Sequence, residues 1–261
     1  MTAEAAIKHQ RSEGGIVLSV DALGLRRMRE SGAAKVRLPR GSAEAILINT
    51  GGGLAGGDCF SFDITVEAHG KLSVTSQAAE RVYRTPGPAA RVGMKLKAAA
   101  GASLSWLPQE TILFDGASLS RSIAADIAGD ARFLAVESVI LGREASGETV
   151  SHASLRDRWR IKRDGKLIFA DDLTIEGTPP MTKAALDGAR AFATVLLVDV
   201  PAEQFADKVR AEIGSCGSAS AWSGKLVARL CATDGFALRK ALIPALTVLN
   251  GGLALPKSWS F

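Results

Sequence analysis

The 261-residue sequence has few of the side chains that build most catalytic and nucleic-acid sites. It contains three histidines, one tyrosine and only 5% aromatic residues. Because successive bases stack on aromatic side chains, this scarcity argues against a platform for single-stranded nucleic acid. His-Glu-x-x-His and paired Cys/His spacings are absent, which excludes the common zinc-site patterns. A Gly-x-Ser-x-Gly elbow for a serine nucleophile is also missing.

The sequence also gives no indication of disulfides, of a signal peptide or of a membrane span. The three cysteines, Cys59, Cys216 and Cys231, are odd in number and widely spaced, which is typical of reduced thiols. Residues 1–10 lack the apolar core of a signal peptide. The apolar stretch at residues 241–255 is interrupted by proline, asparagine and glycine, so it does not predict a membrane span. We expect a soluble, cytoplasmic protein that binds no membrane.

The overall composition is that of a globular protein, with 47% hydrophobic and 23% charged residues. The formal net charge of +5 favours acidic partners only mildly. The length suits one large β-rich domain, which we place at residues 14–261 after a flexible tail at residues 1–13.

Alternating apolar and polar residues predict most of the secondary structure. This pattern predicts strands at residues 16–20, 34–38, 45–49, 60–68, 71–76, 92–98, 103–107, 119–127, 132–141 and 225–232. Asp164-Gly165 predicts a tight hairpin turn. Helical spacing appears late, at residues 201–213 and 235–249. We expect a mainly β fold, a many-stranded sandwich or β-helix-like single domain with two helices near its C-terminal end.

A glycine-rich run stands out at residues 51–57, with glycine at positions 51, 52, 53, 56 and 57. Gly51, Gly53 and Gly56 have the G-x-G-x-x-G spacing of a dinucleotide-binding turn, which requires a helix to follow. Residues 60–66 alternate strictly instead, so a strand follows. The run therefore predicts a sharp corner between two strands, with Asp58 as its one candidate functional side chain.

Most carboxylates of the chain fit surface positions or turn caps, including Glu80, Glu110 and the pair Asp171-Asp172. Glu137 differs because apolar residues flank it within a predicted strand. A buried acid needs a partner, so we expect Glu137 to be paired.

Two basic stretches are compatible with more than one role. Arg156, Arg158, Arg160 and Lys162 occupy alternate positions and predict a basic strand face. Residues 26–29, Arg-Arg-Met-Arg, fit either a solvated strand edge or a contact patch for an acidic protein surface. The basic face leaves open a nucleic-acid-binding β domain. A hydrolase that uses Cys59 or paired acids such as Glu110 is a further alternative.

Motifs spread over almost the whole chain, in a consistent order, resemble the urease accessory protein D (UreD) family. Those motifs are Asn49-Thr50-Gly51-Gly52-Gly53 with Gly56-Gly57-Asp58, the segment 75–84 with Gln77 and Tyr83, Pro108-Gln109-Glu110, Gly142-Arg143 with Ser146-Gly147-Glu148, and the C-terminal segment 255–261. Each motif is weak alone, whereas together they are specific.

The resemblance implies a β scaffold without catalytic activity that assembles with apo-urease and with the accessory proteins F and G. It also implies no tightly bound cofactor and nickel(II) in transit through an internal passage. Mapped by motif position, the passage would be lined by Asp58, Arg81, Glu137 and Asp172. The family commonly has lysine at position 81, and arginine keeps the charge but changes its reach. Sparse oxygen ligands suit release, so we expect no strong nickel site in the isolated chain.

Overall fold

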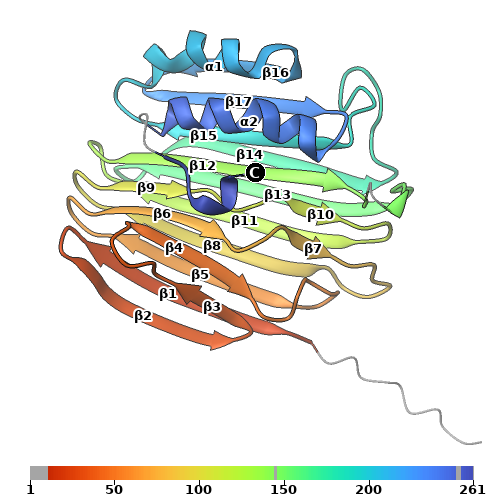
Figure 1. The fold of residues 1–261 in the computed structure, drawn as a ribbon, viewed down its shortest axis with the longest axis horizontal. Helices are drawn as coiled ribbons and strands as arrows, with labels where there is room; N and C mark the ends of the chain where they lie inside the picture. Colours follow the sequence, from red (N-terminus) through yellow and green to blue (C-terminus); the bar gives the residue numbers. More distant parts are fainter. Residues whose placement is uncertain (1–10, 144–145, 251–253, 261) are drawn as a thin grey trace, which may run out of the picture.

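Strands alternate between two face-to-face sheets along most of the chain, as the computed structural model shows (Figure 1). The structure describes residues 11–143, 146–250 and 254–260. The predicted N-terminal tail, residues 1–13, lies mostly outside the described residues, and its last residue begins the first strand. The mainly β fold with two α-helices near the C-terminal end confirms the predicted fold class.

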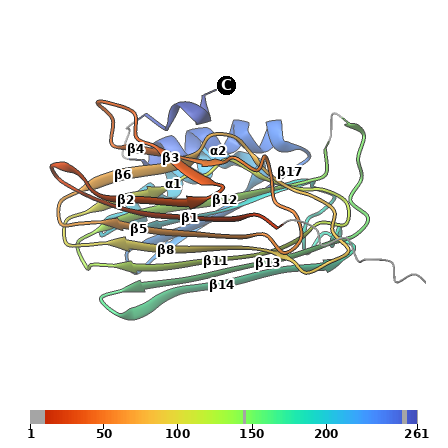
Figure 2. The ribbon, with the colours of Figure 1, turned by 90° about the horizontal axis from the view of Figure 1, so that it is seen from below.

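The first sheet, sheet A, contains seven strands within the described residues, in the order β14-β13-β11-β8-β5-β1-β2 (Figure 2). These strands are β1 (Glu13–Asp21), β2 (Gly24–Gly32), β5 (Cys59–Val66), β8 (Ala90–Ala98), β11 (Ser118–Ile127), β13 (Ala153–Arg163) and β14 (Lys166–Gly177). The central neighbours pair in parallel, and antiparallel hairpins close both ends.

The second sheet, sheet B, runs in the order β16-β17-β15-β12-β9-β6-β4-β3, with β10 also paired to β12 and β7 paired to β10. Its strands are β3 (Ala34–Arg37), β4 (Glu44–Asn49), β6 (Lys71–Ser76), β7 (Glu80–Val82), β9 (Ser103–Trp106), β10 (Thr111–Leu113), β12 (Arg132–Leu141), β15 (Ala191–Val198), β16 (Gly217–Trp222) and β17 (Lys225–Ala232). Parallel pairing from β4 to β12 means that the chain winds repeatedly between the sheets, as in a β-solenoid.

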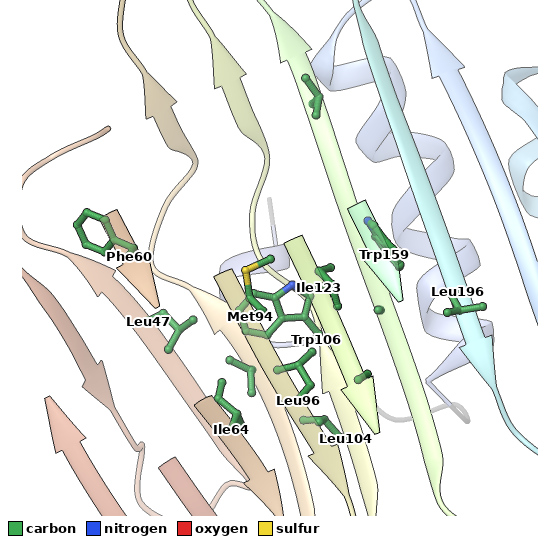
Figure 3. Close-up of a cluster of buried hydrophobic side chains, with 14 of the residues drawn as sticks. Leu47, Phe60, Ile64, Met94, Leu96, Leu104, Trp106, Ile123, Trp159 and Leu196 are labelled. Carbon is green, nitrogen blue, oxygen red and sulfur yellow. The ribbon is translucent and has the colours of Figure 1, made fainter. Parts of the chain in front are cut away.

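The main core lies between the two sheets and follows from strand alternation. Parallel register aligns one inward row across five strands of sheet A: Ile16, Phe62, Met94, Ile123 and Trp159. Trp106 of sheet B lies close to Met94 and Ile123 in the same layer (Figure 3). Because period two sends every second residue inward, Arg121 and Asp157 share the inward parity of Ile123 and Trp159.

A second core lies on the other face of sheet B, under helices α1 (Ala206–Ile213) and α2 (Gly235–Leu249). Strands β12 and β15 are therefore buried on both faces. The sequence of β15 is apolar except for Thr194 and does not alternate, and it was not predicted as a strand. Short 3₁₀ turns η2 (Ala202–Phe205), η3 (Gly214–Cys216) and η4 (Lys257–Trp259) complete this layer.

The Asp164-Gly165 turn is confirmed, because both residues have positive φ, 49° and 76°. The helix predicted at residues 201–213 is α-helical only from Ala206, and its first turn is the 3₁₀ segment η2. Strands β2, β7, β10 and β16 were also not predicted, because they are short, polar or exposed. Of the helices in the described part of the chain, none is both long and apolar enough to cross a bilayer.

Truncation of the inward row should destabilise the fold. Ile123 is 1% exposed, so Ile123→Ala removes apolar burial and leaves a cavity. We expect it to lower the free energy of unfolding by about 2–5 kcal/mol. The neighbouring side chain of Ser122 points outward, so Ser122→Ala should alter the free energy of unfolding by less than about 0.5 kcal/mol. Urea denaturation measures both, and equal effects would contradict the inward assignment of Ile123.

Candidate functional site

A hollow of about 220 Å³ opens between the two sheets beside the glycine-rich corner. Its floor is apolar and includes Leu54, Phe60 and Met94. Its polar lining comes from several strands and the loops between them: Asn49, Gln77, Glu80, Arg81, Gln109, Thr111, Arg121 and Glu137. This mixture of an apolar wall and a few convergent polar groups is the usual character of a ligand site.

A buried ion network includes two residues of this lining, Arg121 and Glu137. Arg121 of β11 donates through Nη1 to Oε2 of Glu137 in β12 and through Nη2 to Oδ2 of Asp157 in β13. Each of the three side chains is less than 10% exposed. The Nε1 of Trp106 donates to the other oxygen of Glu137 at 2.8 Å. Thus Glu137 has the buried partner that its sequence position required, and the network joins sheet A to sheet B.

Charge balance in this network leaves the two carboxylates in competition for one cation. Burial raises the pKa of Glu137, the positive charge of Arg121 opposes that rise, and the negative charge of Asp157 adds to it. Burial alone would lower the pKa of Arg121, but its two carboxylate neighbours hold that pKa above the ordinary value. The guanidinium therefore stays charged, and the pKa of Glu137 stays above its ordinary value.

Glu80 of β7 supplies a second carboxylate to the hollow, closer to its mouth. The Nδ2 of Asn49 donates to both its oxygens, at 3.2 and 3.3 Å, and also to the carbonyl of Gly53 at 3.0 Å. Burial raises the pKa of Glu80 to about 7, against the opposing effects of Asn49 and Arg81. Arg81 follows in the same strand and lies exposed in the lining.

The glycine-rich corner positions Asn49 and the mouth of the hollow through close backbone contacts. A Cβ on Gly53 would lie 2.5 Å from the ring of Tyr83, whose hydroxyl donates to the carbonyl of Gly52 at 2.8 Å. A Cβ on Gly56 would lie 1.9 Å from Oγ1 of Thr85. Because there is no room for a side chain at these positions, the corner requires glycine.

Asp58 closes this corner and faces away from the hollow. Its carboxylate accepts from the backbone N–H groups of Ser12 at 2.7 Å and of Ala55 at 2.8 Å, and it is 3% exposed. Gly57 beside it has a φ of +86°, and a Cβ at this position would lie 2.1 Å from Nη1 of Arg11. Asp58 therefore ties the start of β1 to the corner, and it is not part of the lining.

Asp172 lies on the outer face of sheet A, also away from the hollow. It accepts from Nε of Arg158 at 3.0 Å and from Nη2 of Arg160 at 2.6 Å, with its side chain 51% exposed. Arg160 and Arg158 hold the pKa of Asp172 below its ordinary value. Of the four residues predicted to line a passage, the structure brings Arg81 and Glu137 into one hollow and places Asp58 and Asp172 elsewhere.

The Gln109-Glu110 motif attaches the C-terminal segment to the wall of the hollow. Nη1 of Arg239 in α2 donates to Oε1 of Gln109 at 2.8 Å and to Oε1 of Glu110 at 2.9 Å. The same guanidinium lies 5.2 Å from the ring centre of Trp259, whose Nε1 donates to the carbonyl of Leu107 at 2.9 Å. Two of the motifs from the sequence, Pro108-Gln109-Glu110 and the C-terminal segment, are thus joined through Arg239.

Arg121, Asp157 and Trp106 were not predicted from the sequence as site residues, and Glu80 was predicted to be a surface acid or turn cap. A signal for the first two was present, because Arg121 alternates with Leu119 and Ile123, and Asp157 shares the face of Trp159. Among the described residues, no group of three or more His, Cys, Asp or Glu side chains is placed to hold a metal ion. The arrangement offers separate oxygen donors along a hollow.

Removal of Arg121 should lower the free energy of unfolding, because two buried carboxylates lose their partner. Arg121→Leu leaves Glu137 and Asp157 without their cation, so we expect a loss of about 3–5 kcal/mol of unfolding free energy at pH 7.5. The loss should shrink at pH 5, where the carboxylates accept protons more readily. Urea denaturation at both pH values measures this. Arg91→Leu, an exposed arginine in β8, is the matched control, and equal losses would contradict the network's role.

Glu80 should make stability depend on pH near neutrality. Its pKa is raised from 4.5 to about 7, so the folded state binds the proton more tightly than the unfolded chain does. The free energy of unfolding should therefore fall as pH rises through this range, by on the order of 1–3 kcal/mol. Glu80→Gln should flatten that decline, whereas the exposed Glu176→Gln should not. Denaturation curves from pH 4.5 to 8 test this, and identical slopes for Glu80→Gln and the unmodified chain would refute it.

Comparisons with known proteins agree with the motif order. The family model described as UreD urease accessory protein matches residues 13–260. A urease accessory protein UreD of Rhizobium etli is 47% identical over 266 residues, covering 98% of this chain and 97% of the relative. The Agrobacterium fabrum protein of the same name is 45% identical, with 99% and 94% covered. That of Mesorhizobium japonicum is 45% identical, with 90% and 88% covered. The chain therefore belongs to the UreD family of urease accessory proteins.

Proposed function

We propose that this chain binds apo-urease and, together with the accessory proteins F and G, enables the insertion of nickel into the urease active site. The observation that carries this proposal is the family match over residues 13–260, supported by relatives that carry the name urease accessory protein UreD. In this role the chain is a scaffold and not an enzyme, and it works in the cytoplasm, where its cysteines remain reduced thiols.

We further propose that the hollow between the sheets forms part of the route of nickel. Its donors are the carboxylates of Glu80 and Glu137 and the side-chain amides of Asn49, Gln77 and Gln109. Oxygen donors of this kind suit divalent cations, although they bind nickel less tightly than imidazole or thiolate sites do. Few donors at separate points would let a cation pass without a deep trap, so nickel(II) is cargo here and not a resident cofactor.

The raised pKa of each carboxylate supports reversible exchange. Near neutral pH, burial keeps Glu80 and Glu137 close to protonation, so an arriving cation displaces a proton and a departing one allows the proton to return. Arg121 counters the charge at the inner end, and Arg81 adds positive charge at the mouth. These cations weaken the attraction for nickel and thereby favour release.

The alternative of a nucleic-acid-binding domain receives less support. The basic strand face of β13 is partly neutralised, because Asp172 accepts hydrogen bonds from both Arg158 and Arg160. Arg156 and Lys162 remain exposed on that face, and backbone phosphates would need a longer run of free cations than this.

The proposal predicts that Glu80 and Glu137 affect nickel loading more than assembly. We expect Glu80→Gln and Glu137→Gln to reduce the nickel content and activity of urease several-fold when urease and all accessory proteins are co-expressed. Both changes keep the side-chain shape, so complexes with apo-urease should still form. Metal analysis of purified urease, activity assays and co-purification measure these three quantities.

Two controls make this experiment decisive. Co-expression without the chain sets the baseline, and Glu176→Gln, an exposed acid on β14, should behave like the unmodified chain. Unchanged nickel content without the chain would refute the accessory role itself. Normal loading with both hollow variants would refute the route but leave the scaffold role in place.

A further inference from the structure

Strand β2 forms one edge of sheet A, and its outer side is not paired with any strand in the described part of the chain. It is nine residues long, and Figure 1 shows it along the lower border of the molecule with no element beyond it. A free strand edge presents unpaired backbone N–H and C=O groups, which another extended chain can pair with. This edge contains the basic stretch Arg26-Arg27-Met28-Arg29.

The inner face of β2 carries apolar side chains that nothing in the described chain covers fully. Register with β1 places Leu25 opposite Val20 and Met28 opposite Leu18, so both point to the core side of sheet A. Val20 and Leu18 are 6% and 1% exposed, whereas Leu25 and Met28 are 50% and 48% exposed. The difference arises because sheet B ends at the four-residue strand β3, so β2 extends beyond it.

The apolar ledge continues around the tip of the β1-β2 hairpin. Leu23 at the tip is 92% exposed, and beside it lies an open hollow of about 700 Å³ that Leu25, Leu38 and Leu72 help to line. Large apolar side chains grouped in this way are uncommon on the surface of a monomer unless a partner covers them.

The outer face of the same strand is basic. Arg27 lies opposite Ser19 and Arg29 opposite Val17, both on the solvent side of sheet A. Arg26 is paired with Asp21 at 3.3 Å, but neither Arg27 nor Arg29 forms an ion pair with any described residue. An added strand would therefore meet apolar side chains on one face and two free guanidinium groups on the other.

This charge pattern decides between the possible occupants. If a second copy of the chain paired its β2 with this edge, it would bring arginines against arginines, and like charges on neighbouring strands are destabilising. A strand that alternates apolar and acidic residues would match both faces at once. The edge thus disfavours self-association and favours an acidic partner.

We propose that the free edge of β2 is a docking site for an extended, acidic segment of a partner protein, which pairs with it as an additional strand. The partner's apolar side chains would pack on Leu25 and Met28, and its carboxylates would bind Arg27 and Arg29. Main-chain hydrogen bonds supply affinity in this mode of recognition, and alternate side chains supply specificity. The site does not depend on the nickel route, because it lies on a different part of the fold from the hollow.

A labelled ten-residue peptide that alternates glutamate and valine is a suitable probe for the full-length chain. Fluorescence anisotropy should detect binding that weakens as salt increases, and hydrogen exchange should slow in residues 24–32 when the peptide is present. A peptide that alternates lysine and valine should not bind. Absence of binding by the acidic peptide, or protection that maps outside β2, would overturn the proposal.

Charge reversal separates this site from general electrostatic attraction. Arg27→Glu with Arg29→Glu should weaken binding of the acidic peptide by about tenfold or more and permit binding of the lysine peptide. Lys95→Glu with Lys97→Glu changes the net charge equally on the same face of sheet A, but β8 is paired on both sides, so binding should be retained. Equal weakening by the two double variants would refute a docking site at β2.

The apolar half of the site has its own test. Leu25→Ser with Met28→Ser keeps the arginines and the backbone edge but removes the ledge, and it should weaken the acidic peptide several-fold. These side chains are half exposed, so the variant should remain folded, which circular dichroism verifies. Unchanged affinity would show that no strand packs on this face and would overturn the proposed geometry.

Discussion

The ion network of Arg121, Glu137 and Asp157 is the interaction on which the interior of this protein depends. Charged groups lose their hydration when they are buried, so each member is tolerable only because the others are in place. Arg121 and Asp157 belong to sheet A and Glu137 to sheet B, so the network also specifies how the sheets face each other. Two carboxylates share one guanidinium in this network, and one of them, Glu137, lines the hollow.

Two further constraints shape that hollow from outside. The glycine-rich corner approaches Tyr83 so closely that side chains are excluded, and it places Asn49 against Glu80. In addition, Arg239 ties α2 and the C-terminal segment to Gln109, which lines the hollow, and to Glu110. Segments far apart in the chain therefore converge on one cavity.

The middle strands of sheet A and its β2 edge differ in backbone pairing and in charge. Its middle strands are paired on both sides, and Asp172 of the edge strand β14 partly neutralises Arg158 and Arg160 of β13. Its β2 edge combines unpaired backbone, exposed apolar side chains and free arginines. The arginines of this edge disfavour its pairing with a second copy of the same strand.

Much of the candidate site was within reach of the sequence. The need for a partner at Glu137 followed from its apolar neighbours, and the corner character of residues 51–57 followed from the strand after them. Alternation would also have assigned Arg121 and Asp157 to the interior, since each shares the parity of buried neighbours. The role of Asp58 could not be predicted in this way. Its carboxylate accepts hydrogen bonds from the backbone of Ser12 and Ala55, and the bond to Ser12 depends on a contact between the start of β1 and the corner that no local pattern specifies.

By itself the sequence determined the strands that alternate, the Asp164-Gly165 turn, the late helices and the family, since each depends on neighbours close in the chain or on motif order. Only the tertiary structure decided that Arg121 meets Glu137 across the sheets, that Glu80 joins them in one hollow, and that β2 extends past the end of sheet B. The physical reason is that register and winding set these contacts. Both depend on the packing of the complete core, and local preferences carry no information about it.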